Sequence, residues 1–215
     1  MPTRRHFLAG ALAPLVLPAR AFASPRCVAD PKHGGELCKT FVDVQSAYQE
    51  TYYARREPAA VWVACVAVVL ATYGHVIQQP RIIKEAYGDI AAISLDGLAA
   101  AKPLERRWKD DDGASFSAAV EAVFDANAQA ARFDQDALIA AVANGDPLIL
   151  MGGGHPVVLT ALAFAKGDSP ERLIAGFVFD PMPMVGPRAL DNGEIQPMSA
   201  GGKLRLALRL KLAPA

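Results

Sequence analysis

An apolar stretch between Pro58 and Gly74 constrains the fold of this chain more than any other segment. Residues 60–73 contain no charged side chain and are rich in valine and alanine. Pro58 suits the first turn of a helix, and Gly74 suits the position after the last turn. Valines also suit a strand, but a run of this length fits a central helix better. We therefore predict a helix over 60–73 that is buried on every face.

The remaining segments divide into two halves. Amphipathic patterns at 78–88, 94–101, 115–124 and 135–143 predict helices before residue 145. Apolar or alternating runs at 147–151, 156–165, 173–180 and 204–212 predict strands after it. We expect an α+β fold: an arm at 24–54, a helical half at 55–145 with the central buried helix, and a mostly antiparallel sheet at 146–215.

Residues 1–23 have the pattern of an export signal. Arg4 and Arg5 precede a weakly apolar run, and small residues at 21–23 suit cleavage. The pair resembles a twin-arginine signal, with an ordinary secretory signal as the alternative. We expect a bacterial periplasmic or secreted protein whose formal charge falls from zero to −3 once three signal arginines are removed. That charge does not favour a nucleic-acid partner, and no run in the mature chain is long enough to span a membrane.

The three cysteines suggest one disulfide and one free thiol. In an oxidising compartment, Cys27 and Cys38 can pair around a short polar loop, although two free thiols remain the alternative. The histidines and cysteines lack zinc-ligand spacing, and no phosphate loop or dinucleotide motif is present. We expect neither a metal nor a cofactor, and we interpret 110–112 as a solvated turn rather than a calcium site.

A histidine and an aspartate stand where two predicted neighbouring strands begin and end. His155 follows three glycines and precedes a strand, and Asp180 ends the next strand. An imidazole oriented by a carboxylate is the usual proton acceptor for a thiol nucleophile. His155 and Asp180 are therefore candidate catalytic residues.

Several motifs resemble papain-like cysteine peptidases of bacteria, including the peptidase domains of bacteriocin-processing exporters. These motifs are the helix ending in Tyr73-Gly74, the segment from Gln79 to Gly88, Gly145-Asp146-Pro147, the Gly154-His155 strand and Asp180-Pro181. The resemblance covers roughly residues 55–190 and implies a papain-like fold with His155 and Asp180 at the catalytic positions.

The chain departs from this family at the nucleophile. The family spacing places the reactive cysteine at Val61 and the oxyanion glutamine at Arg55, whereas Cys65 matches a second cysteine one turn further along the helix. Valine has no lone pair and cannot form an acyl intermediate. The alternative is that Cys65 serves as the nucleophile, although an apolar site would raise its pKa.

Three functional hypotheses remain open. The first is a catalytically degenerate homologue that binds a peptide or protein segment in its cleft. The second is an active cysteine peptidase in which Cys65, His155 and Asp180 are nucleophile, base and orienting group. The third is a structural or interaction protein whose cleft is filled. The oligomeric state cannot be read from the sequence.

Overall fold

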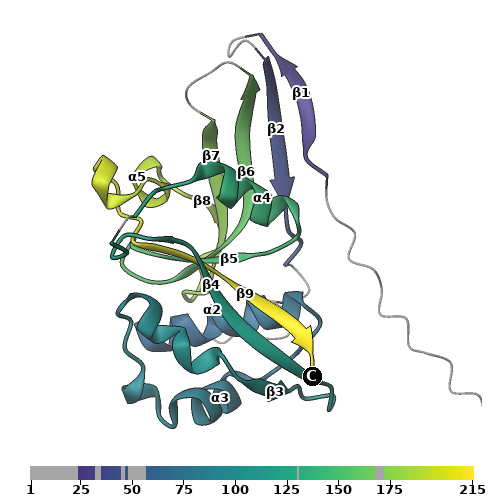
Figure 1. Cartoon of the computed structure of the whole chain (residues 1–215), viewed down its shortest axis with the longest axis vertical. Coiled ribbons are helices and arrows are strands. Elements are labelled where there is room, and N and C mark those ends of the chain that lie inside the picture. The colour runs from purple at the N-terminus through teal and green to yellow at the C-terminus, as the bar shows by residue number, and fades with distance from the viewer. Residues whose placement is uncertain (1–23, 32–34, 45–46, 48–56, 130, 168–171) are drawn as a thin grey trace, which may run out of the picture.

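The computed structural model describes residues 24–31, 35–44, 47, 57–129, 131–167 and 172–215. The expected export signal at 1–23 and the expected oxyanion position at Arg55 lie outside the described residues. In the described parts, helices pack against both faces of a strongly twisted sheet (Figure 1).

A nine-stranded antiparallel sheet organises the described residues. Seven strands follow the order β1-β2-β6-β5-β9-β4-β3, and β7 and β8 continue from the other edge of β6. The length of β6 allows this branching, since its first residues pair with β5 and its later residues with β2, while β7 pairs along the opposite edge. The strands are β1 (Arg26–Asp30), β2 (Gly35–Phe41), β3 (Arg107–Lys109), β4 (Ser115–Asp125), β5 (Leu148–Met151), β6 (Val157–Gly167), β7 (Leu173–Asp180), β8 (Gly186–Ala189) and β9 (Leu206–Pro214).

The helices of the described residues are mostly short. Only α2 and α4 exceed two turns. The α-helices are α2 (Pro58–Thr72), α3 (Gln79–Ile82), α4 (Gln135–Ala143) and α5 (Asn192–Ile195); the other turns are a π-helix, η1 (Ile83–Tyr87), and the 3₁₀ turns η2 (Ile90–Ala92), η3 (Gly97–Ala100), η4 (Lys102–Leu104) and η5 (Met198–Ala200).

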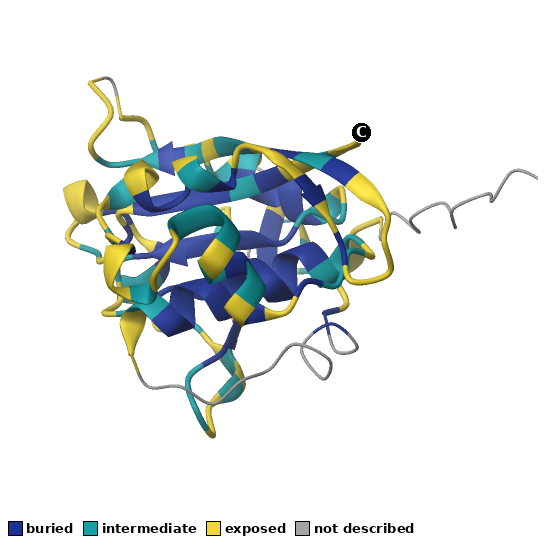
Figure 2. Cartoon of the chain, turned by 90° about the horizontal axis from the view of Figure 1, so that it is seen from below, coloured by how far each residue is buried: buried dark blue, intermediate teal, exposed yellow. Residues whose placement is uncertain are grey.

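Helix α2 is the centre of the core, and the predicted buried helix at 60–73 is confirmed. Every residue over 60–70 is buried, and Figure 2 shows α2 as a dark blue ribbon enclosed by more exposed segments. Pro58 stands in the first turn, and Gly74 follows the helix with a φ of 85°. Glycine adopts that backbone conformation without the steric cost of a β-carbon, which explains why the helix ends there.

The sheet is buried on both faces at the end of the β6–β7 pairing that lies near His155 and Asp180. Val158 and Phe179 belong to the apolar cluster around α2, whereas Leu159 and Val178 belong to the cluster around α4. Neighbouring residues of a strand point to opposite faces, so each strand contributes to both clusters. Full burial of one such side chain contributes about 1.5–3 kcal/mol. The start of β6, two residues after His155, and the end of β7 at Asp180 are therefore firmly held.

The expected papain-like arrangement, with a helical half before residue 146 and a separate sheet after it, is wrong. Strands β1 to β4 all precede residue 146, and β4 pairs with the C-terminal strand β9 from Phe116–Pro214 to Asp125–Leu206. One sheet therefore runs through both parts of the chain. The predicted helix at 94–101 is reduced to the 3₁₀ turn η3, and the one at 115–124 is β4.

The error at 115–124 has a physical cause. The segment is rich in alanine, which favours helices in isolation, and its spacing fits one apolar helix face. Its long-range pairing with β3 and β9 overrides that local preference, because each residue on β4 gains cross-strand partners. The conformation of β4 is therefore decided by its pairing with β9, which lies roughly ninety residues further along the chain.

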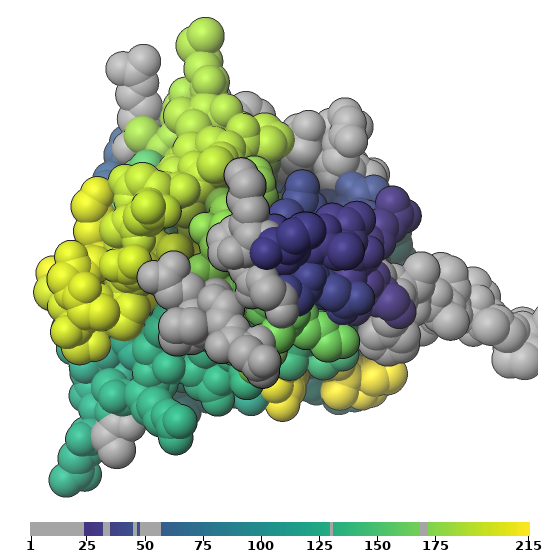
Figure 3. All heavy atoms as spheres, turned by 90° about the horizontal axis from the view of Figure 1, so that it is seen from above, coloured from purple at the N-terminus to yellow at the C-terminus, as the bar shows by residue number. Residues whose placement is uncertain are grey.

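The segment expected to be an arm, 24–54, contributes β1 and β2 to this sheet. β1 pairs with β2, and β2 pairs with β6 from Gly35–Gly167 to Phe41–Ala161. Seen from above, the purple atoms of this hairpin lie against the green atoms of the sheet (Figure 3). Among the described residues, no helix combines the length and the apolar character that crossing a membrane requires.

Candidate functional site

The fold brings His155 and Asp180 together. His155 lies two residues before β6, and Asp180 is the last residue of β7; the neighbouring pair Val158–Phe179 sets their register. His155 Nε2 is 2.9 Å from both Asp180 Oδ1 and Asp180 Oδ2. Nδ1 of His155 has no hydrogen-bond partner among the described residues, so it is available to a ligand.

Asp180 is a buried carboxylate, with only 1% of its surface exposed. The Met182 backbone N–H donates to Oδ1 at 3.0 Å, and Arg188 Nε donates to Oδ2 at 3.0 Å. Burial alone raises the pKa of Asp180, but the hydrogen bonds from His155, Met182 and Arg188 outweigh it and lower that pKa below its usual value. The carboxylate is therefore ionised at neutral pH and holds the imidazole in one orientation.

Arg188 and Glu194 extend this contact into a four-residue network that the sequence did not predict. Arg188 donates from Nη1 and Nη2 to the two carboxylate oxygens of Glu194, each at 2.8 Å. Glu194 is held by a capping box with Asp191 at the start of α5. The Asp191-x-x-Glu194 spacing signals a helix start, but nothing local to the sequence links that helix to Asp180.

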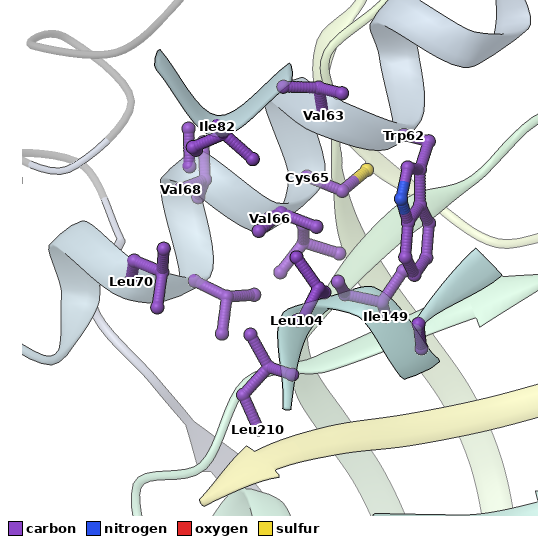
Figure 4. Packing of buried hydrophobic residues seen from close by; sticks show 14 of the residues in the cluster. Trp62, Val63, Cys65, Val66, Val68, Leu70, Ile82, Leu104, Ile149 and Leu210 are labelled. Carbon is purple, nitrogen blue, oxygen red and sulfur yellow. The ribbon is translucent and has the colours of Figure 1, made fainter. Parts of the chain in front are cut away.

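Cys65 does not take part in this network. It is fully buried in the apolar cluster around α2, and Figure 4 shows it among Trp62, Leu104 and Ile149. No hydrogen bond joins it to His155 within the described residues. Burial, with a smaller contribution from the negative charge of Asp180, raises the pKa of the Cys65 thiol well above its usual value. A protonated, enclosed thiol is a poor nucleophile.

Val61 occupies the first turn of α2, where its N–H donates to the Glu57 carbonyl at 3.0 Å. Only 1% of its surface is exposed. The structure therefore places a buried hydrocarbon at the position where the family resemblance expects sulfur. The equivalent oxyanion position, Arg55, lies outside the described residues.

The structure joins Cys27 to Cys38 in a disulfide across β1 and β2. The two residues are direct cross-strand partners. These sulfurs and Glu36 are close enough together to suggest a metal site, but sulfurs that are bonded to each other are not thiolate ligands. The disulfide therefore links the two strands of the β1–β2 hairpin covalently.

A second histidine–aspartate contact lies at the other end of α2. His75 Nδ1 is 2.8 Å from Asp110 Oδ2, and its ring stacks on Phe116 with 4.0 Å between centroids. Asp110 is only 5% exposed, so the interpretation of 110–112 as a wholly solvated turn is wrong at its first residue. No described cysteine or serine is hydrogen-bonded to His75, and the contact joins the segment after α2 to the loop between β3 and β4.

A groove runs beside His155. One hollow of about 260 Å³ is lined by Leu95, Met151, Gly152, Gly154, His155, Pro156 and Arg205. A second hollow of about 340 Å³ shares Leu95, Met151 and Arg205 with the first and continues past Asn127 to Met198. We call these two hollows together the His155 groove. Val61 and Cys65 are not among the residues that line it.

Glycines allow this groove to form. Gly152 has a φ of 150°, and a β-carbon there would overlap the backbone carbonyl oxygen of Lys203. The close approach brings the end of β5 against the segment that carries Arg205. The backbone N–H groups of Gly153, Gly154 and His155 donate no hydrogen bond to any described residue. Gly154 and His155 line the groove, so their N–H groups are free to pair with a ligand there.

Comparison of the chain with protein-family models gives no match, and comparison with characterised proteins gives none either.

Proposed function

We propose that this chain is an exported, catalytically inactive relative of bacterial cysteine peptidases that binds a peptide or protein segment in the His155 groove. The ordered sequence motifs described above support the relationship, and the Cys27–Cys38 disulfide supports an oxidising location in the periplasm or outside the cell. The family's helical first half is not part of this proposal, since the sheet runs through both halves.

One observation carries the proposal: His155, which is hydrogen-bonded to the buried Asp180, lines an open groove, while no described thiol is hydrogen-bonded to this histidine. His155 lines both the 260 Å³ hollow and a smaller one beside Glu194. Cys65 is enclosed on the inner face of α2 and lacks a hydrogen bond to His155. A site with a positioned imidazole but no nucleophile can hold a ligand without cleaving it.

The groove suits an extended chain. Leu95 and Met151 provide apolar contact surface, and Gly154 and His155 line the groove with backbone N–H groups that donate to no described residue. Main-chain hydrogen bonds supply affinity for extended peptides, and neighbouring hollows accept alternate side chains. The occupant we propose is therefore an extended polypeptide segment.

A peptide-library experiment tests this function. We expect the purified protein to retain a subset of a random nonapeptide library without hydrolysing it. Leu95→Trp fills the shared part of the groove and should weaken binding at least tenfold. The matched control is Leu98→Trp, because Leu98 lies on η3, is 37% exposed and does not line the groove.

Each other outcome contradicts the proposal. Equal binding by both tryptophan variants would place the peptide elsewhere. An absence of peptide binding would favour the filled-cleft interaction protein. Peptide hydrolysis that disappears in Cys65→Ala would establish the active-peptidase alternative, with Cys65 as nucleophile.

A further inference from the structure

Arg205 stands at the junction of the two hollows of the His155 groove. It lines the hollow beside His155 and also the hollow that continues to Met198. A segment that occupies both hollows therefore passes beside Arg205, together with Leu95 and Met151, which also line both.

The backbone of Arg205 is held in place on two sides. Its N–H donates to the Met151 carbonyl at 2.9 Å, and its carbonyl accepts from the Ala126 N–H at 2.8 Å. These contacts tie it to the ends of β5 and β4. A side chain that starts from a fixed backbone loses less freedom when it binds a ligand.

Arg205 is exposed, and its guanidinium has no hydrogen-bond or ion-pair partner among the described residues. Two nearby cationic side chains, by contrast, have acidic partners. Arg188 forms ion pairs with Asp180 and Glu194. Lys203 contacts Asp191. The positive charge of Arg205 is thus uncompensated at the middle of the groove.

The far hollow contains an acidic side chain as well as Arg205. Asp96 lines it, and its carboxylate forms no ion pair with Arg205 or any other described residue. A ligand with an acid beyond Arg205 would meet repulsion from Asp96. Leu95, Met151 and Met198 line the rest with apolar surface.

We propose that the His155 groove selects a polypeptide segment carrying an internal aspartate or glutamate, which pairs with Arg205 and is flanked by apolar residues. This inference rests on the proposed peptide-binding function. An internal side chain is favoured over a terminal carboxylate because the groove continues on both sides of Arg205. The planar guanidinium binds a carboxylate through two parallel hydrogen bonds.

The test compares peptides that differ at one position. Selected nonapeptides with acetylated and amidated ends carry Glu, Gln or Lys at the central position, and a fourth peptide carries Gln there but has a free C-terminal carboxylate. Binding is measured by fluorescence anisotropy at low and moderate salt. We expect the Glu peptide to bind about tenfold more tightly than the Gln peptide, which corresponds to about 1.4 kcal/mol, and the preference to shrink as salt rises.

Charge reversal gives the decisive comparison. Arg205→Gln should abolish the preference for Glu, and Arg205→Glu should reverse it toward the Lys peptide. Arg107 is an exposed residue of β3 and does not line the groove, so Arg107→Glu makes the same charge change elsewhere and should retain the wild-type preference.

Three outcomes overturn the inference. Equal binding of the Glu and Gln peptides by wild-type protein removes acid selection while leaving peptide binding intact. A preference for Glu that survives Arg205→Glu places the acid elsewhere. Tightest binding by the free-carboxylate peptide replaces the internal acid with a chain terminus. Failure of all peptides to bind is distinct, because it removes the proposed function itself.

Discussion

The replacement Asp180→Asn tests whether the buried network holds the site together. The substitution keeps the shape of the side chain but removes its charge and exchanges one acceptor oxygen for a donor nitrogen. In the wild-type protein, the Asp180 carboxylate accepts hydrogen bonds from His155, Arg188 and the Met182 backbone. An asparagine leaves at least one of them without an acceptor.

The expected loss follows from those contacts. A hydrogen bond to a charged group contributes about 1.5–3 kcal/mol. Arg188 keeps both contacts with Glu194 and is partly exposed, so water and Glu194 compensate in part. We therefore expect Asp180→Asn to lower the free energy of unfolding at pH 7 by about 2 kcal/mol, near the lower end of that range.

The difference should depend on pH in a defined direction. The pKa of Asp180 is lower in the folded protein than its usual value. Its stabilising contribution is therefore fully present above the unfolded pKa of about 3.9, and it disappears as the pH falls through the lower folded value. The contribution of Asp180 to the gap between wild type and Asp180→Asn should shrink below about pH 4.

Urea unfolding at pH 7, 5, 4 and 3 measures this gap, with equal m-values required for comparison. Asp96→Asn makes the same chemical change at an exposed position and should stay within about 0.5 kcal/mol of wild type. A loss for Asp180→Asn no larger than that of the control would refute the structural role of the network. A loss that persists unchanged at pH 3 would refute its electrostatic origin.

Three further predictions concern the groove and the helix. Cys65 should resist iodoacetamide in native protein and react in denaturant, because burial raises its pKa; rapid labelling of native protein, seen by mass spectrometry, would contradict this. Gly152→Ala should lower stability by about 1–3 kcal/mol through overlap with Lys203, and should cost more in thermal unfolding than Gly201→Ala, where the added β-carbon meets open space. Val61→Cys should gain no peptide hydrolysis, since position 61 is buried outside the groove; turnover of a fluorogenic peptide would show that the position faces the ligand.

Elements with strong local signals were predicted correctly. The helix over Gln135–Ala143 and the strand over Leu173–Asp180 appear with the predicted boundaries. Asp134 caps the helix through its side chain, and Asn144-Gly145 ends it. Such signals act over a few residues, so they are readable before any tertiary contact is known.

Elements that depend on distant partners were not predictable. β4 has helix-favouring residues and becomes a strand through β3 and β9. Arg188 reaches Asp180 only because β8 folds back on β7, and Glu194 reaches Arg188 only because α5 follows β8. The buried Asp110 is hydrogen-bonded to His75, which lies 35 residues earlier.

By itself, the sequence determined a buried central helix, a hydrocarbon at position 61 and a histidine and an aspartate at the ends of two strands. These properties follow from side-chain chemistry, helix-ending residues and short-range periodicity. Tertiary structure alone decided that one sheet passes through both halves, that Cys65 is enclosed away from hydrogen-bonding reach of His155, and that Arg205 meets the glycine loop in a groove. The reason is physical: strand pairing, burial and ion-pair geometry depend on contacts between residues far apart in the chain, and no local pattern specifies which distant segment will supply them.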